Sequence, residues 1–269
     1  MGYGDRVGAG WRFGGPLTRA VRWLLIANVA AFVAQIVVHL AVPDGLERVG
    51  VWLGLSPKLA IGKLRLWQFV TYGFLHQVVT VLPFHIASNL FLLWLFGCDV
   101  ERELGTGRFL RLYFGALVAA GLCMLPMYWT SVWGASGAVF GVMAIYARLF
   151  GGRVLLLMGL IPMRARTLVF ILVGLEVLYL LSTGGRSPVA HLAHLGGFAL
   201  GWFFLPLERA VEGRRDARRF RRAQQSAREE AEIRVRVDRL LAKVAREGPG
   251  SLSRRERDFL SRASRMFRK

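Results

Sequence analysis

The amino-acid sequence predicts an all-α membrane protein with six transmembrane helices and both termini in the cytoplasm. Of its 269 residues 54% are hydrophobic, and its mean hydropathy is +0.42, which is more apolar than an ordinary soluble domain. The apolar residues gather in segments near the roughly 20 residues that a helix needs to cross a bilayer. These segments are 21–42, 82–98, 109–126, 136–150, 167–182 and 188–207.

The basic residues alternate between loops, and this pattern predicts the topology. They lie before the first segment and in the connections from segment two to three and from four to five. They are Arg12, Arg19, Arg22, Arg102, Arg108, Arg111, Arg148, Arg153, Arg164 and Arg166. The connections from three to four and from five to six carry only Arg186. Because loops rich in Lys and Arg remain in the cytoplasm, the pattern predicts six spans with cytoplasmic ends.

The net charge of +19 raises the question of a nucleic-acid partner. Residues 208–269 hold 20 Lys and Arg against 10 Asp and Glu, so about half of the excess lies there, and much of the rest flanks the spans. Membrane topology therefore explains the charge, and we expect no nucleic-acid partner. An anionic lipid surface at the cytoplasmic face is the expected partner of the basic residues.

We expect three parts: a short basic cytoplasmic arm (1–19), a six-helix domain (20–207) and a basic cytoplasmic helical tail (208–269). The first 20 residues lead into a full-length span, so we expect no cleavable signal peptide. In the tail, residues 226–246 repeat apolar side chains at helical spacing. Gly248-Pro249-Gly250 should end that helix. Ser253 and Glu256 have the spacing of a capping box for a last helix.

Two further stretches are apolar but unlike spans. Loop 43–81 contains Trp52 and Trp67, which favour the membrane interface, so we expect it at the outer surface. Segment 153–163 is too short to span and contains Pro162, so we expect a cytoplasmic interfacial stretch.

Polar side chains inside the apolar segments are candidates for function, because such groups are costly in a membrane. His85, Ser136 and His194 lie 14, 12 and 14 residues before the charges that end their segments on the cytoplasmic side (Asp99, Arg148 and Glu208). At 1.5 Å per residue all three lie roughly 18–21 Å above that boundary. We therefore predict that they meet at one depth, about 10 Å below the outer face of the hydrocarbon core.

The fourth segment is too short to cross the core, so its helix should begin inside the membrane at Ser136. The irregular stretch before it, 127–135, would be tolerated only beside protein or a water-filled cavity. A hydrolase needs such a cavity because water is its second substrate. The helix start would also direct backbone N–H groups and the positive end of the helix dipole at a developing oxyanion.

Glycines predict close packing of the fourth and sixth helices. Gly137 with Gly141, and Gly197 with Gly201, each form a GxxxG pair. Such packing would let the Ser136 hydroxyl reach an imidazole, and Phe140, one turn along from Ser136, could stack on that ring.

His85 and Asn89 share one helix face and could both donate to an oxyanion. Ser136 could instead be a helix-packing residue, and His85 with Asn89 a structural hydrogen-bonded pair. No acidic residue is expected near His194, since the nearest, Glu176, lies in the fifth segment, so the sequence favours a Ser–His dyad. His76, His85, His191 and His194 could also bind a metal, but no carboxylate or cysteine accompanies them; we expect no metal and no cofactor.

Three ordered motifs over residues 67–203 resemble those of the rhomboid intramembrane serine proteases. They are His85-Ile-Ala-Ser-Asn89, followed by Leu95-Phe96-Gly97 and Glu101-Arg-Glu-Leu-Gly105; Gly134-Ala-Ser136-Gly137; and Ala193-His194-Leu-Gly-Gly197-Phe-Ala-Leu-Gly201. The first is similar to the family's HxxxN and glycine/glutamate motif, the second to GxSG and the third to AHxxGxxxG. The second is not the G-x-S-x-G elbow of α/β-hydrolases.

The resemblance implies a six-helix rhomboid bundle with Ser136 as nucleophile and His194 as general base and acid. It implies an oxyanion site of His85, Asn89 and the Ser136 amide, and supporting roles for Gly134, Gly137, Phe140, Gly197 and Gly201. It implies a transmembrane protein substrate that enters past the fifth helix and is cut near small residues. His191 is the competing base, but the motif spacing selects His194.

The sequence departs from the family at two places. Trp67 is followed by Gln68 where the family often has Trp-Arg, and the connection between His76 and His85 is longer than is usual. The departures concern the outer loop. An inactive rhomboid-like chaperone or adaptor that binds transmembrane helices is the alternative function. A transporter or channel would need paired charges along a path, which the segments lack. We expect a multi-pass protein of a bacterial cytoplasmic (inner) membrane.

Overall fold

In the computed structural model the described residues are 15–78, 83–157, 160–183 and 190–266. The basic arm (1–19) and Arg186 thus lie largely or wholly outside the described residues. The chain divides into two compact units between Leu205 and Pro206, a boundary that falls inside one long helix.

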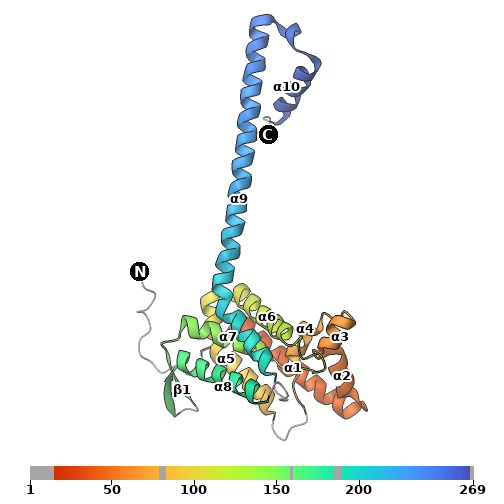
Figure 1. The fold of residues 1–269 in the computed structure, drawn as a ribbon, viewed down its shortest axis with the longest axis vertical. Coiled ribbons are helices and arrows are strands. Elements are labelled where there is room, and N and C mark those ends of the chain that lie inside the picture. Colours follow the sequence, from red (N-terminus) through yellow and green to blue (C-terminus); the bar gives the residue numbers. More distant parts are fainter. Residues whose placement is uncertain (1–14, 79–82, 158–159, 184–189, 267–269) are drawn as a thin grey trace. The chain divides into compact units, whose positions relative to one another are not determined.

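The first unit is built from helices on the six apolar segments (Figure 1). They are α1 (Arg19–Ala41), α5 (Phe84–Leu104), α6 (Thr106–Cys123), α7 (Ser136–Leu149), α8 (Ala165–Thr183) and the first part of α9 (His191–Glu247). Among the described residues, α1 and α8 are long and apolar enough to cross a membrane by length and composition.

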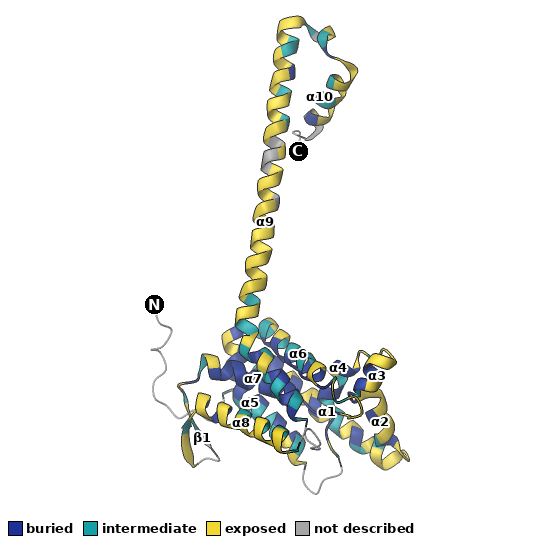
Figure 2. Cartoon of the chain, in the orientation of Figure 1, coloured by how far each residue is buried: buried dark blue, intermediate teal, exposed yellow. Residues whose placement is uncertain are grey.

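Helix α7 forms the centre of this unit. Residues 137–147 are all buried, and the helix packs against α5, α6 and α8. Figure 2 shows the contrast between buried α7 and the largely exposed α8. A helix that is apolar on every side has no solvent face, so burial against its neighbours is the stable arrangement. As the sequence predicts, α7 begins at Ser136, after the non-helical residues 127–135.

The described part of the loop 43–81, residues 43–78, is mostly helical, which the sequence did not predict. It contains α2 (Gly45–Leu53), α3 (Pro57–Gly62), α4 (Gln68–Thr71) and the short 3₁₀ helix η1 (Tyr72–Phe74). The buried Gln68 ties these pieces together: its amide donates to the Val51 carbonyl at 2.9 Å and accepts from the Ser56 N–H at 3.3 Å. The Tyr72 hydroxyl donates to the Leu117 carbonyl of α6 at 2.7 Å, which holds the loop on the helices.

A small antiparallel hairpin is the second departure from the predicted all-α fold. The segment predicted as an interfacial stretch forms β1 (Val154–Leu157) and β2 (Ile161–Arg164), with Leu156 opposite Pro162. A two-stranded ribbon tolerates this proline because one edge of each strand needs no hydrogen-bond donor.

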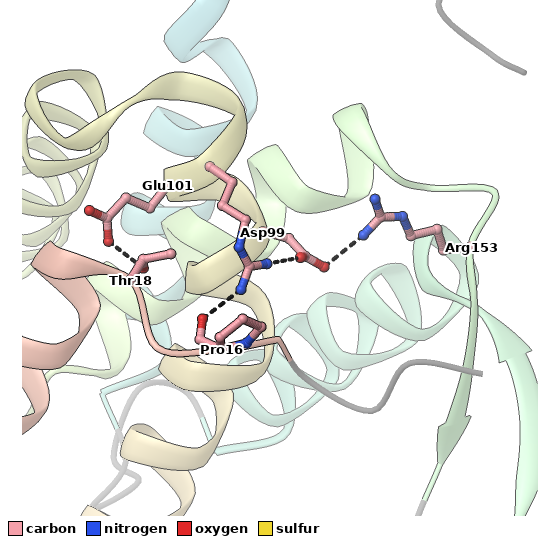
Figure 3. A network of polar contacts seen from close by, with 6 residues as sticks. Pro16, Thr18, Asp99, Glu101 and Arg153 are labelled. Carbon is pink, nitrogen blue, oxygen red and sulfur yellow. Dashed lines mark hydrogen bonds and ion pairs between the residues drawn. The ribbon is translucent and has the colours of Figure 1, made fainter. Parts of the chain in front are cut away.

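A carboxylate at the end of α5 caps the start of α1 (Figure 3). Glu101 accepts hydrogen bonds from the backbone N–H groups of Ala20 and Val21, at 2.9 and 3.0 Å, and from the Thr18 hydroxyl. The Thr106 hydroxyl of α6 adds a bond of 2.7 Å. Because the first N–H groups of a helix have no partner within it, an acceptor with negative charge stabilises that end.

An ion-pair cluster lies beside this cap. Asp99 contacts Arg102 and Arg153, both at 2.6 Å, and Arg102 also donates to the Pro16 carbonyl at 2.6 Å (Figure 3). The cluster thus joins the end of α5 to the start of the hairpin and to the residues before α1.

The second unit contains the rest of α9, a 3₁₀ turn η2 (Pro249–Ser251) and α10 (Arg254–Met266). The helical region, its end at Gly248 and the capping box are as predicted: the Ser253 N–H donates to Glu256 at 2.7 Å, and the Glu256 N–H to the Ser253 hydroxyl at 3.3 Å. The buried apolar residues of this second unit include Leu240, Leu252 and Ala263.

Candidate active site

Ser136 occupies the first position of α7, directly after a backbone turn that only glycine adopts easily. Gly134 has a φ of +131°, and its N–H donates to the Tyr72 carbonyl at 2.9 Å. A Cβ on Gly134 would lie 3.0 Å from two ring atoms of His85. The close approach and the positive φ both exclude a larger residue, and the N–H groups of the first turn of α7 are left without partners inside the helix.

The His194 side chain lies beside the Ser136 hydroxyl. Its Nε2 is 2.7 Å from Ser136 Oγ, which is hydrogen-bond distance. The Phe140 ring stacks on the imidazole, with centroids 4.5 Å apart and planes within 5°. Of the two candidate bases that the sequence offers, the one against Ser136 in the structure is His194.

The two GxxxG pairs bring α7 and α9 together. A Cβ on Gly197 would collide with the Gly137 carbonyl, and a Cβ on Gly201 with that of Gly141. A Cβ on Gly141 would itself lie 3.0 Å from the Gly197 carbonyl oxygen. The backbones therefore touch, and this contact sets the distance between the helix that carries Ser136 and the helix that carries His194.

His85 and Asn89 of α5 line the same cavity as Ser136, His194 and Phe140, and its volume is about 750 Å³. One Asn89 amide hydrogen is engaged by the His85 carbonyl at 2.9 Å. The buried Nδ1 of His85 has no hydrogen-bond partner among the described residues. The structure thus brings the four polar residues, drawn from three helices, to one cavity.

His76, which the sequence grouped with His85 only as a possible metal ligand, lies behind His85. The rings meet edge to face with centroids 5.2 Å apart. Gln35 of α1 holds the His76 backbone by two bonds of 3.0 Å, one to its carbonyl and one from its N–H. Burial, together with the neighbouring His85, lowers the pKa of His76 to about 4, so that this ring is neutral at pH 7.

An acidic residue does lie beside His194, and the expectation that none would is wrong. Glu176 Oε2 of α8 is 2.5 Å from His191 Nδ1, with which it forms a hydrogen bond. The same oxygen is 2.9 Å from His194 Nδ1, but off the line of that N–H, so this is an ion-pair contact and not an aligned hydrogen bond. The sequence did contain an indication that Glu176 belongs to the site, because Glu176 is an ionisable residue within an apolar segment.

A possible metal site in the described part of the chain is formed by Glu176, His191 and His194. Their donor atoms lie within 4.8 Å of one another, so the sequence argument that no carboxylate accompanies the histidines does not hold. The distances favour a shared proton over a metal. Ligand atoms bound at about 2.0–2.1 Å in a tetrahedral zinc site lie about 3.3 Å apart, whereas Glu176 is 2.5 and 2.9 Å from the two nitrogens.

The family of the chain follows from a comparison with known proteins. A family model described as the Rhomboid domain matches residues 63–209, more than half of the chain. The chain belongs to the rhomboid family. This rhomboid domain includes α5 to α8, the start of α9 and every residue that lines the cavity.

Named relatives are distant but extend over much of the chain. Rhomboid-like protease 3 of Toxoplasma gondii is 30% identical over 144 residues, 52% of this chain and 53% of that protein. Rhomboid protease GlpG of Pectobacterium atrosepticum is 28% identical over 187 residues, 70% of this chain and 60% of that protein. This rhomboid-family chain thus matches between half and two thirds of the length of these relatives.

Proposed function

We propose that this rhomboid-family chain is an intramembrane serine endopeptidase, which hydrolyses a peptide bond in or near a transmembrane segment of a membrane protein. The relatives named as proteases support this proposal. The observation that carries it is the 2.7 Å contact between Ser136 Oγ and His194 Nε2, with Phe140 stacked on the imidazole. A serine and a histidine that only packed helices together would not need an aromatic support for the ring.

In the proposed reaction Ser136 Oγ attacks the scissile carbonyl carbon, and its proton passes to His194 Nε2. The new O–C bond gives a tetrahedral oxyanion. As the C–N bond breaks, the proton on Nε2 goes to the leaving nitrogen, and the substrate remains as an ester of Ser136. Water then attacks this ester, gives a proton to Nε2, and the carboxyl product departs as Ser136 Oγ regains its hydrogen.

His85, Asn89 and the Ser136 backbone N–H are the proposed donors to the oxyanion. They line or border the cavity, and the Ser136 N–H belongs to the unpaired first turn of α7. Each such donor contributes about 3 kcal/mol of transition-state stabilisation in well-studied hydrolases. Because Asn89 uses one amide hydrogen on the His85 carbonyl, its second hydrogen is the one assigned to substrate.

We place this machinery in a multi-pass protein of a bacterial inner membrane, with six spans and cytoplasmic termini. The apolar segments, the alternation of basic loops and the mainly exposed apolar surface of α1 and α8 support this. A transmembrane substrate would enter past α8. The basic residues 208–269 would contact anionic lipid at the cytoplasmic face.

The decisive experiment compares cleavage of a single-span substrate by the purified full-length protein and by Ser136→Ala. We expect Ser136→Ala to lose cleavage. Ser182→Ala, which removes an exposed hydroxyl from α8, is the matched control and should retain it. If Ser136→Ala cleaves as well as the unchanged protein, the mechanism is wrong. If neither the unchanged protein nor Ser136→Ala cleaves the substrate, but both bind it, the chain is the alternative chaperone or adaptor.

A further inference from the structure

The Glu176 side chain, which is 16% exposed, extends from α8 towards two histidines of α9. One oxygen, Oε2, serves both rings, through a hydrogen bond to His191 and an ion-pair contact to His194. The Tyr179 ring, one turn along α8, stacks on His191 with centroids 5.7 Å apart and planes within 10°. The carboxylate therefore has a defined position beside the proposed base.

The contact of His194 with Ser136 determines which ring nitrogen faces this carboxylate. For Nε2 to accept the Ser136 hydroxyl hydrogen, the neutral ring must carry its own hydrogen on Nδ1. Nδ1 is the atom 2.9 Å from Glu176 Oε2. A carboxylate at that distance favours the tautomer with hydrogen on Nδ1, which is the tautomer that general-base catalysis requires.

The same contact matters more once the serine proton has moved. The His194 side chain, which is only 10% exposed, is then a cation, and an unpaired charge on a largely buried group is costly. Glu176 is the acidic side chain within ion-pair distance of that cation in the described part of the chain. Attraction that is stronger in the charged intermediate than in the resting ring lowers the barrier.

We propose that Glu176 is a positioning residue that completes a Ser136–His194–Glu176 relay, so that the catalytic unit is a triad and not a dyad. This inference rests on the proposed function. Glu176 takes no proton: it remains a carboxylate while the proton travels from Ser136 Oγ to His194 Nε2 and on to the leaving nitrogen. His191 is the hydrogen-bond donor to the carboxylate and holds it in place.

The expected effect is smaller than in hydrolases with an aligned triad. There, replacing the acid by its amide lowers kcat by about 10⁴-fold. Here the oxygen lies off the line of the His194 N–H, and His191 shares it. We therefore expect Glu176→Gln to lower kcat by about 10- to 100-fold, as for the loss of one contact with a charged group, with KM within about twofold, because the carboxylate acts on the base and not on substrate binding.

The test measures kcat and KM of the full-length protein in detergent with a single-span substrate, and the rate at which a fluorophosphonate labels Ser136. Glu176→Gln should slow labelling and kcat together, and Glu176→Asp, which keeps the charge on a shorter side chain, should recover part of both. Ser182→Ala, which removes an exposed hydroxyl from α8, is the matched control and should resemble the unchanged protein. Dialysis against a zinc and calcium chelator should change none of these rates.

Several results would overturn the inference. Glu176→Gln with unchanged kcat and labelling would do so, as would a change confined to KM or to thermal stability. If Glu176→Gln does not fold, Glu176→Asp decides, and an unchanged kcat in that variant counts against the relay. Loss of activity on chelation, restored by zinc, would make the three residues a metal site. Failure of the proposed function is a separate result: Ser136→Ala would then cleave normally.

Discussion

The backbone of Gly197 rests against the Gly137 carbonyl, with no room for a Cβ between the two helices. This contact fixes how far His194, on the same face of α9 as Gly197, lies from Ser136. The distance between the two proposed catalytic side chains is therefore set by an interhelical contact that contains no side chain at all.

We predict that Gly197→Ala separates α7 from α9. Overpacking of this kind costs about 1–3 kcal/mol of stability, and a displacement near 1 Å at the reacting groups costs on the order of 10²-fold in rate. Cleavage assays and thermal unfolding in detergent would measure both effects. Gly174→Ala is the control, since a Cβ there meets nothing within 4 Å. Normal cleavage by Gly197→Ala would show that the helices adjust.

Phe140→Leu should weaken the support of the His194 ring. Aromatic stacking contributes about 0.5–1.5 kcal/mol beyond burial, so we expect kcat to fall about 2- to 10-fold with KM little changed. Phe170→Leu changes an exposed phenylalanine on α8 and serves for comparison. Equal kcat values in the two variants would contradict a role for the stack.

Gly134→Ala should abolish activity while it lowers stability only in part. The added Cβ would require a strained φ of +131° and would lie 3.0 Å from the His85 ring, displacing a proposed oxyanion donor. Fluorophosphonate labelling of Ser136 measures this directly, and we expect it to be lost. Gly107→Ala, where a Cβ meets nothing within 4 Å, should label normally.

Glu101→Gln should destabilise the first unit by about 2–3 kcal/mol, because hydrogen bonds to a charged acceptor contribute more than neutral ones. Burial alone would raise the pKa of Glu101, but its four hydrogen bonds outweigh burial and hold that pKa below the usual 4.5. A carboxyl with a lowered pKa in the folded state contributes stability that is complete above about pH 5 and is lost as the pH falls through 4.5 towards the folded pKa.

Unfolding measured between pH 7 and pH 3 tests this dependence. The unchanged protein should lose stability in the acid range, and Glu101→Gln should lose less there. Glu103→Gln, which changes an exposed glutamate two residues away, is the control and should keep the full dependence. An identical acid profile for Glu101→Gln and the unchanged protein would show that other carboxylates cause the loss.

Truncation at Gly213 should leave cleavage in detergent intact. The residues removed lie in the second unit, while the cavity residues all belong to the first. Binding to vesicles that contain anionic lipid should weaken in the truncated protein and in high salt. Loss of cleavage without unfolding would instead give residues 213–269 a regulatory role.

The sequence predicted the helices and the grouping of His85, Asn89, Ser136 and His194 because both follow from apolar length and residue spacing. It did not predict the contact of Glu176 with His194. Glu176 lies ten residues after Arg166, which marks the cytoplasmic boundary of the fifth segment. At 1.5 Å per residue this places Glu176 about 15 Å above that boundary, about one helical turn below His194. A glutamate side chain bridges such a difference, but counting along helix axes does not include the reach or direction of a side chain.

The helices of loop 43–81 were missed for another reason. They are short, and their order depends on contacts such as those of the Gln68 amide with the Val51 carbonyl and the Ser56 N–H. These partners are 17 and 12 residues away in the chain, so no local periodicity reports them. The hairpin 154–164 was likewise hidden, because its pairing is a property of two strands together.

The Glu101 cap also bears on the order in which the protein is made. The N–H groups that it binds belong to residues 20 and 21, and the carboxylate follows them by about eighty positions. A ribosome therefore delivers α1 long before its cap exists, and the start of that helix must remain hydrated until α5 has been synthesised. The completed contact requires that α1 and α5, the first two long helices, have met, so it forms only after α5 is made even though it stabilises the first helix of the chain.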